Sequence, residues 1–225
     1  MAEDGFIALN LKVYEESCGK RGIELAKIAR DVSQKTGVRI VVCPNATLVR
    51  ECAVTGAEVF AQHVDGNASG AYTGSITAKM LLEAGVSGSL INHSEKRINP
   101  ENVKVSVEAL KKFGLESMVC AKDVHECAQL AQFKPTYIAI EPPELIGSGV
   151  SVSSAKPQIV TGAVHAVREI TPDVKLVCGA GVSTPEDVKR AFELGVEGVL
   201  IASAYVKATN PAKLLEQMAE QIIRQ

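Results

Sequence analysis

The stretch NPENVKVSVEALKKFGLESMVCAKDVHECAQLAQFKPTYIAIEPP, residues 99–143, holds two successive helix-then-strand units. Asn99 directly before a proline is typical of a helix start, because Asn caps backbone N–H groups and proline is tolerated at the first helical position. The apolar residues that follow keep helical spacing until Gly114 ends the helix. Apolar runs at 116–120 and 137–140 then predict two strands, with a second helix starting between them at a capping-box sequence.

The same alternation extends outward to both ends of the chain. We expect strands at residues 6–9, 38–42, 58–62, 89–91, 116–120, 137–140, 174–178 and 198–201, with helices between them. Such alternation requires a parallel sheet with right-handed crossovers, and no linker or composition shift divides the units. About eight units favour an α/β fold, a closed single-domain (β/α)8 barrel over residues 1–225. An open doubly wound sheet needs fewer units, and no G-x-G-x-x-G follows the first strand.

Composition and charge narrow the class of protein. The 225 residues are 46% hydrophobic and 22% charged, which is ordinary for a soluble globular protein. A net charge of −2 predicts neither nucleic-acid binding nor an anionic-membrane surface. No apolar run is long enough to span a bilayer, and the first residues lack the basic and apolar regions of a signal peptide. We therefore expect a cytoplasmic protein.

The six cysteines show neither a C-x-x-C pair nor zinc-like spacing with histidine. Several end apolar runs, where a reduced thiol behaves as a small hydrophobe, so we interpret all six as structural thiols. Cys178, beside a glycine at a strand end, is the alternative candidate for a catalytic thiol. Cys127 is expected at an exposed helix start, where its thiol would be accessible to oxidation, so redox sensitivity of this residue is left as an alternative.

Glu141 follows the strand at 137–140, at the carboxyl end where parallel α/β folds place their chemistry. Pro142 and Pro143 stiffen the exit, and glycines at 147 and 149 allow positive φ and close approach to a ligand. This combination indicates a lid over an acid/base group. By itself the segment also fits a strand cap followed by an ordinary surface loop.

Other polar residues follow strands at the same end of the expected barrel. Asn10 and Lys12 follow the first strand, and His93 and Glu95 follow the fourth. Lys12 is either a solvated lysine, a cation for an anionic substrate or a Schiff-base lysine. His93 is either a hydrogen-bonded structural residue or, beside a helix start, a neutral imidazole that polarises an oxyanion.

The turns after the last two strands consist of small residues, Gly179-Ala180-Gly181 and Ala202-Ser203. They fit tight connections between strand and helix. They also fit the usual phosphate site of phosphate-binding barrels, because small side chains expose convergent backbone N–H groups.

Together these motifs resemble the triosephosphate isomerase family, in order and spacing and over nearly the whole chain. The motifs are Asn10-x-Lys12, Gly70-Ala71-Tyr72-Thr73-Gly74, Asn92-His93-Ser94-Glu95-Lys96-Arg97, Glu141-Pro142-Pro143 with Ile146-Gly147-Ser148-Gly149, and Gly179-Ala180-Gly181-Val182. Cys178-Gly179-Ala180-Gly181 and Ala202-Ser203 stand where many members have Tyr-Gly-Gly-Ser and Gly-Gly, and the chain has no tryptophan. These departures match the compact archaeal type of the family.

The resemblance implies a TIM barrel that interconverts glyceraldehyde 3-phosphate and dihydroxyacetone phosphate through an enediolate, in glycolysis and gluconeogenesis. It implies Glu141 as the base and His93 as the neutral electrophile. Lys12 and Asn10 would hold the substrate, with Glu95 in support. The implied phosphate contacts are Ile146 and Gly147, at the tip of a lid over 142–152, and Gly181, Ala202 and Ser203.

The resemblance implies no metal or organic cofactor, because the protein supplies both acid and base. It implies a homo-oligomer, a homotetramer with a homodimer as the alternative, whose loop around Thr73 inserts beside Lys12 of a neighbouring subunit. Two other interpretations stay open. One is another phosphate-binding barrel, such as a Schiff-base aldolase using Lys12. The other is a non-catalytic barrel that binds a metabolite or a partner, which has no chemical need for lysine, histidine and glutamate together.

Overall fold

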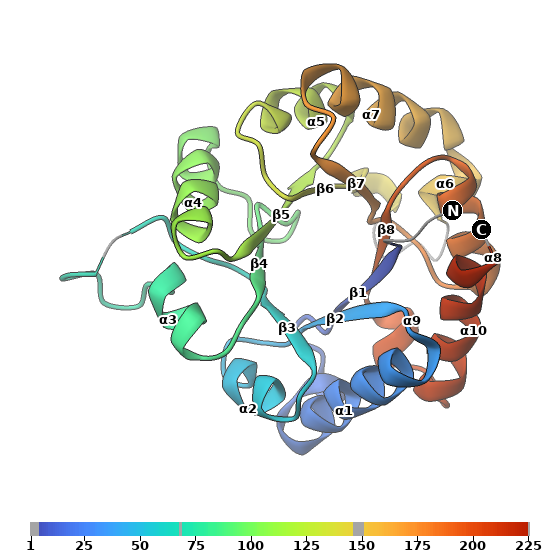
Figure 1. Ribbon diagram of the computed structural model, residues 1–225, viewed down its shortest axis with the longest axis horizontal. Helices are drawn as coiled ribbons and strands as arrows, with labels where there is room; N and C mark the ends of the chain where they lie inside the picture. The colour runs from blue at the N-terminus through green and yellow to red at the C-terminus, as the bar shows by residue number, and fades with distance from the viewer. Residues whose placement is uncertain (1–4, 68, 146–150, 225) are drawn as a thin grey trace.

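The computed structural model describes residues 5–67, 69–145 and 151–224. Parallel strands close into a barrel in sequence order, as Figure 1 shows along the barrel axis. They are β1 (Phe6–Asn10), β2 (Arg39–Cys43), β3 (Glu58–Ala61), β4 (Gly88–Ile91), β5 (Glu116–Ala121), β6 (Tyr137–Ile140), β7 (Lys175–Cys178) and β8 (Gly198–Ile201). β8 pairs with β1 and completes the ring. The predicted (β/α)8 barrel is confirmed.

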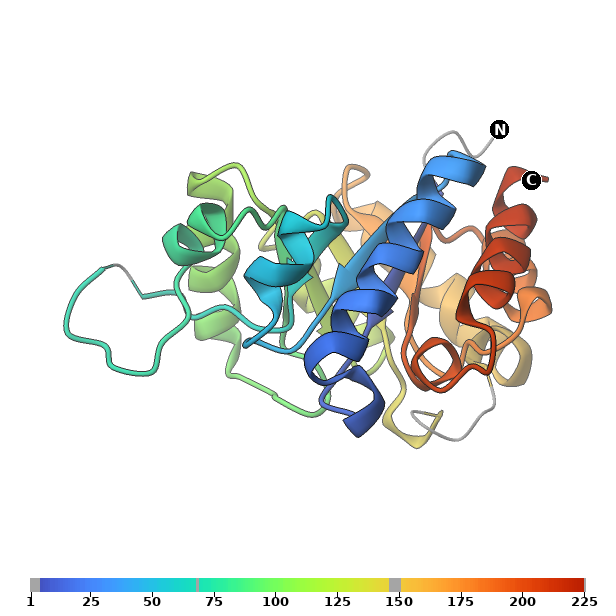
Figure 2. The same ribbon diagram turned by 90° about the horizontal axis from the view of Figure 1, so that it is seen from below.

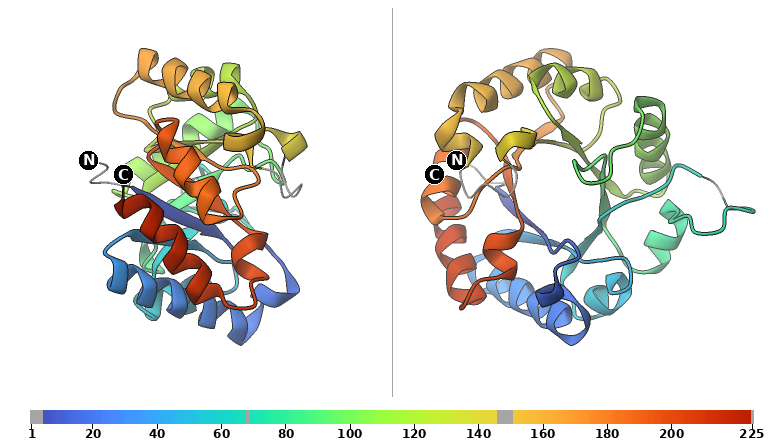
Figure 3. Two further views of the ribbon diagram at one scale, coloured as in Figure 1. Left: turned by 90° about the vertical axis from the view of Figure 1, so that its right-hand side faces the viewer. Right: turned by 180° about the vertical axis from the view of Figure 1, so that it is seen from behind.

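The helices form an outer ring around the strands (Figures 1 and 3). They are α1 (Gly19–Thr36), α2 (Val49–Val54), α3 (Ala78–Glu83), α4 (Pro100–Lys112), α5 (Val124–Ala131), α7 (Pro157–Ile170), α8 (Pro185–Glu193) and α10 (Pro211–Ile223). Four short elements were not predicted: η1 (Glu15–Ser17), η2 (Pro143–Leu145), α6 (Val152–Ala155) and α9 (Ser203–Val206). Among the described residues, no helix has the length and apolar character needed to cross a bilayer.

Side-chain caps explain why several helices begin where they do. The side chains of Asn99, Asp123, Thr184 and Asn210 each accept a hydrogen bond from a backbone N–H in the first turn. At Thr184 the capping box is complete, because Asp187 also accepts from the backbone N–H of Thr184. Gly37 closes α1 with a φ of 75°, a left-handed conformation that glycine adopts without steric cost.

Alternation along each strand divides the core into two regions. Residues such as Phe6 and Ala8 face the barrel interior with Phe60, Leu90 and Met118. Their neighbours Ile7 and Leu9 belong to the larger cluster between the strands and the helices. Because side chains alternate with a period of two, the inward face of β1 continues to Asn10 and that of β6 continues to Glu141.

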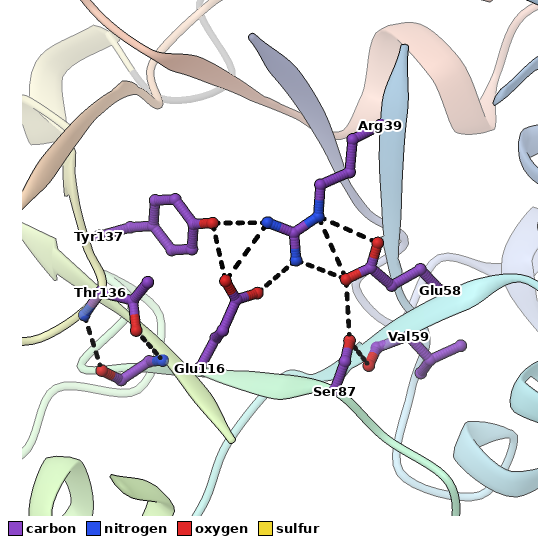
Figure 4. Close-up of polar contacts among 8 residues, drawn as sticks. Arg39, Glu58, Val59, Ser87, Glu116, Thr136 and Tyr137 are labelled. Atoms are coloured by element: carbon purple, nitrogen blue, oxygen red, sulfur yellow. Dashed lines mark hydrogen bonds and ion pairs between the residues drawn. The ribbon is translucent and has the colours of Figure 1, made fainter. Parts of the chain in front are cut away.

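The amino-terminal mouth of the barrel is closed by an ionic cluster (Figure 4). Arg39 at the start of β2 donates to Glu58 on β3, with Nε 3.0 Å from Oε2, and also pairs with Glu116 on β5. Its Nη1 lies 2.6 Å from the Tyr137 hydroxyl on β6. Ser87 Oγ donates to Glu58 Oε1 at 3.1 Å. One guanidinium therefore joins the beginnings of four strands.

The long loop between β3 and α3 projects away from the barrel wall (Figure 2). Its base is held by Asp65, whose N–H donates to the Ile76 carbonyl at 2.8 Å and whose carboxylate accepts from the Ile76 N–H at 2.8 Å. Tyr72, near the tip of the loop, is 53% exposed.

The expectation for Cys127 is wrong. Its side chain is fully buried, and it shares the inner face of α5 with Leu130 and Ala131. The spacing of these three residues is that of one helix face, which packs against the strands. All six cysteines were interpreted as structural thiols. Cys18 does not fit that interpretation, because it is exposed while the other five thiols are buried.

Candidate active site

A small cavity of about 60 Å³ lies at the carboxyl ends of the strands, the end that faces the viewer in the right panel of Figure 3. The predicted residues that line it are Asn10, Lys12, His93, Glu141, Gly181, Ala202 and Ser203. Its other lining residues are Tyr14, Gly179, Val182, Ser183 and Leu200. The fold thus brings together side chains from the ends of β1, β4, β6, β7 and β8. The predicted lid tip, Ile146 and Gly147, lies outside the described residues.

Glu141 is the most enclosed acid of the site. It follows β6 directly, its N–H donates to the Ala121 carbonyl at 2.8 Å, and the residue is only 4% exposed. Its Oε1 lies 3.5 Å from His93 Nε2, while Oε2 is buried with no hydrogen-bond partner among the described residues. A buried oxygen without a partner costs about 1–3 kcal/mol, so its retention indicates a ligand-directed group.

Backbone geometry determines which nitrogen of His93 carries the proton. The Glu95 N–H lies 3.2 Å from His93 Nδ1. A backbone N–H only donates, so Nδ1 keeps its lone pair and a neutral ring carries its proton on Nε2. Nε2 faces Glu141, and Asn10 Nδ2 lies 3.4 Å from it. The segment that supplies this N–H is a turn and not the helix start that the sequence indicated.

Two effects on the charge of His93 oppose each other. Burial lowers the pKa of the imidazole, but the hydrogen bond and charge of Glu141, together with the charge of Glu95, raise it, and the net shift in pKa is upward. Protonation would put a second N–H on Nδ1, against the Glu95 N–H. The ring is therefore neutral above this raised pKa, with Nε2 as its donor.

Lys12 is held in a conformation that lysine rarely adopts. Its φ is 48°, in the left-handed region, and its N–H is satisfied by Asn10 Oδ1 at 3.0 Å. Lys12 Nζ lies 2.6 Å from Glu95 Oε1, so Glu95 orients the lysine from beside the cavity. Asn92, next to His93, has a φ of 62°. Left-handed non-glycine residues cost about 1–3 kcal/mol each and cluster at functional sites.

The small-residue turns form the opposite wall of the cavity. Gly181 has a φ of 72°, which a side chain would strain. The Ala180 carbonyl accepts from the Val152 N–H at 3.0 Å, and this bond joins the turn after β7 to α6. Gly181, Ala202 and Ser203 line the cavity with small side chains or none, which lets an anionic group approach the backbone closely.

Gly179 was placed by sequence reasoning in a small-residue turn, but its contact with Glu141 was not predicted. A Cβ atom at this position would lie 2.6 Å from Glu141 Cγ, far inside contact distance. Gly179 is therefore needed so that the Glu141 side chain has room. The sequence does show that Gly179 follows β7 on the inward face. Its contact with Glu141, however, can be seen only in the folded barrel. Tyr14 and Ser183 were likewise missed.

The catalytic-thiol alternative has no support in the structure. Cys178 is buried, and burial raises the pKa of its thiol to about 12. Because the thiolate is the nucleophile, a thiol with this pKa is unreactive near neutral pH. Burial also raises the pKa of the Cys120 thiol beside Glu141.

Comparison with known proteins agrees with this geometry. The model of the family described as triosephosphate isomerase matches residues 5–218. The chain belongs to the triosephosphate isomerase family. It is 46% identical over 218 residues to the triosephosphate isomerase of Methanosarcina barkeri, which covers 96% of this chain and 98% of that one. It is 45% identical over 217 residues to that of Methanocaldococcus jannaschii, with 96% and 99% covered.

A solved structure has the same fold. The crystal structure of triosephosphate isomerase from Bartonella henselae superimposes with a TM-score of 0.77 at 22% identity, covering 99% of this chain and 100% of that one. The resemblance predicted from the motifs is thus confirmed, and the related sequences named above are archaeal.

Proposed function

We propose that this isomerase interconverts glyceraldehyde 3-phosphate and dihydroxyacetone phosphate. The observation that carries the proposal is the pairing of an acid and a donor on one small cavity. Glu141 offers a carboxylate oxygen, Oε2, that has no hydrogen-bond partner among the described residues, and His93 offers Nε2–H, with 3.5 Å between Oε1 and Nε2. Aldose–ketose isomerisation needs both: a base at carbon and a proton donor at oxygen.

Glu141 takes a proton from the carbon beside the carbonyl, and the C–H electron pair forms the double bond of the enediol. His93 gives the proton of Nε2 to the carbonyl oxygen, where negative charge develops, and takes the hydroxyl proton of the neighbouring oxygen, so the ring returns to its neutral form. Glu141 then returns its proton to the former carbonyl carbon, and the neighbouring carbon becomes the new carbonyl. Lys12, with Nζ against Glu95, stabilises the negative charge, and Asn10 holds the substrate beside the imidazole.

The phosphate is assigned to the wall of small residues, Gly181, Ala202 and Ser203, with Ile146 and Gly147 at the lid tip completing it. A closed lid excludes water, which otherwise would promote loss of phosphate from the enediolate. The anchored carboxyl-terminal flank of this segment supports this role, since Ser151 Oγ caps α6 and the Val152 N–H donates to the Ala180 carbonyl in the turn after β7.

The assembly is proposed to be a homotetramer, with a homodimer as the alternative. The exposed Tyr72 and Thr73 of the projecting loop are suited to contact a neighbouring subunit. A groove of about 530 Å³ adjoins the site and includes Lys12, Gln62 and Glu95 in its walls. A loop seated there would lie beside Lys12. The protein is proposed to act in the cytoplasm, in glycolysis and gluconeogenesis.

The test is a coupled assay of the purified protein on glyceraldehyde 3-phosphate, with Glu141→Gln alongside. Conversion by the wild type that the variant loses would support both the reaction and the base. No conversion by a folded wild type would overturn the isomerase proposal. Borohydride treatment with substrate tests the alternative of a Schiff-base enzyme, because an imine on Lys12 would be trapped covalently. The ion pair between Lys12 and Glu95 does not favour Lys12 as a Schiff-base nucleophile.

A further inference from the structure

The charges around the cavity are unfavourable for a phosphate dianion. Lys12 is paired with Glu95 at 2.6 Å, and Glu141 adds a second carboxylate to the cavity wall. With His93 neutral, these three charged groups sum to −1. The turns at Gly181 and Ala202 contribute backbone dipoles but no formal charge. A phosphorylated substrate therefore gains from a further cation at the rim.

Lys207 occupies such a position. It follows α9, and its N–H donates at 2.9 Å to the carbonyl of Ser203, a residue of the cavity wall. Its ammonium Nζ lies 4.8 Å from the ring centroid of Tyr14, another residue of that wall. A cation over an aromatic face at this distance is attracted by the negative charge of the ring face, so the Tyr14 ring favours this position of the ammonium group.

The turn that carries the Tyr14 ring, under the Lys207 ammonium group, is held by hydrogen bonds. The Tyr14 carbonyl accepts from the Ser17 N–H at 3.0 Å, from Ser17 Oγ at 2.9 Å and from Cys18 Sγ at 3.3 Å. These contacts hold the turn that carries the ring.

The ammonium group is not saturated by its acidic neighbour. Glu16 Oε1 lies 3.8 Å from Lys207 Nζ, and the two side chains are 49% and 52% exposed. An ion pair this long and this exposed is weak, so the ammonium group is available to an incoming anion.

We propose that Lys207, positioned on Tyr14, is a specificity-determining residue that attracts the phosphate dianion of the substrate to the rim of the cavity. The inference rests on the proposed function and adds to it the cation that selects phosphorylated over unphosphorylated trioses. Lys207 acts on encounter and retention, and takes no part in proton transfer.

The test compares Lys207→Met with Lys207→Arg, which keeps both the charge and the stacking on Tyr14. For Lys207→Met we expect kcat/KM on glyceraldehyde 3-phosphate to fall about fivefold at low ionic strength and to approach wild type at high salt, because screening removes long-range attraction. On glyceraldehyde, which lacks the phosphate, kcat/KM should be unchanged. Lys207→Arg should restore both the rate and its salt dependence.

The matched control is Lys112→Met. Lys112 Nζ lies 6.0 Å from the centroid of the Phe113 ring, so this variant also removes a stacked lysine. It lies in the last turn of α4, which leads back to the opposite end of the barrel. An equal loss of rate in Lys112→Met, or an unchanged salt dependence and substrate preference in Lys207→Met, would overturn the proposal.

Binding separates this proposal from the isomerase reaction. Titration of the wild type and of Lys207→Met with inorganic phosphate, followed by calorimetry, should show weaker binding in the variant. Weaker binding together with an inactive wild type would overturn the isomerase proposal and support the role of Lys207. Equal binding in an active enzyme would overturn the role of Lys207 alone.

Discussion

The two mouths of the barrel are built on the same strands and treat polar groups in opposite ways. At the amino-terminal mouth, Glu58 and Glu116 each accept from the Arg39 guanidinium, and Ser87 and Tyr137 add further donors. At the carboxyl-terminal mouth, Glu141 Oε2 and Ser94 Oγ are buried without a partner among the described residues. The first mouth is satisfied within the protein, whereas the second is left to be satisfied by a ligand.

An apolar layer separates the two mouths. Tyr137 and Glu141 face inward at opposite ends of β6, and four residues of extended chain span about 13 Å. Between them lies Ala139, with its cross-strand neighbours Cys120 and Val177. Changes at one mouth should therefore leave the other unaffected, and four variants examine that independence.

The largest effect is expected for Glu141→Asp. Shortening the base by one methylene moves the carboxylate away from the reacting carbon, so kcat should fall about 100-fold or more while KM changes little. Steady-state kinetics measure the loss, and urea unfolding should show unchanged stability. Glu108→Asp on the exposed surface of α4 is the control. Unchanged turnover in Glu141→Asp would remove Glu141 from the mechanism.

Next comes Gly179→Ala. The new Cβ would lie 2.6 Å from Glu141 Cγ, so the Glu141 side chain must move. Such a shift costs the fold little but displaces the base, and we expect kcat to drop about 10- to 100-fold. The control is Gly162→Ala on α7, where the nearest neighbour, Val124 Cγ2, is 3.4 Å away. If Gly179→Ala keeps wild-type kcat, Gly179 does not position Glu141.

Arg39→Met should lower the stability of the fold and leave catalysis unchanged, the reverse of Gly179→Ala. It leaves Glu58 and Glu116 facing each other without a cation, and we expect a loss of about 1–3 kcal/mol in the free energy of unfolding. This is less than for a fully buried pair, because the three side chains keep 31–33% exposure. Urea unfolding measures it, and kcat should be unchanged. Arg190→Met, which breaks an exposed pair with Glu193, should cost under about 1 kcal/mol. A matching loss of kcat in Arg39→Met would show that the mouths are coupled.

The smallest effect concerns the proton of His93. The pKa of this imidazole is raised chiefly by Glu141 against the effect of burial, so imidazolium accumulates, and activity falls, as pH drops through that raised value. Removing the charge in Glu141→Gln should lower the pKa of His93. Imidazole NMR titration follows the shift, with His125 on α5 as an internal reference. A His93 pKa that stays constant in the variant would show that Glu141 does not control it.

Much of the fold was predictable because local signals agreed with one another. The caps at Asn99, Asp123, Thr184 and Asn210 depend on contacts within one turn, which the sequence encodes directly. The short helices α6 and α9 were missed because four residues are too few to show a helical period.

The site likewise has features that were predictable from the sequence and features that were not. Glu141, His93 and Lys12 were named from motifs, and their approach to one cavity followed from the rule that barrel sites lie at strand carboxyl ends. The need for Gly179 was not predictable, because it depends on the distance between side chains of two adjacent strands. The Arg39 cluster also required the closed ring, since its members come from β2, β3, β5 and β6. Cys127 was misplaced because the start of α5 was considered without its buried face.

The exposure of Cys18, set against five buried thiols, makes this residue a chemically unique attachment point. A thiol-reactive dye would couple there without any prior removal of cysteines. Cys18 Sγ lies 3.3 Å from the carbonyl of Tyr14, a residue of the cavity wall, so the label would stand close to the entrance. Its fluorescence would report the arrival and departure of ligands in stopped-flow measurements on the otherwise unaltered chain.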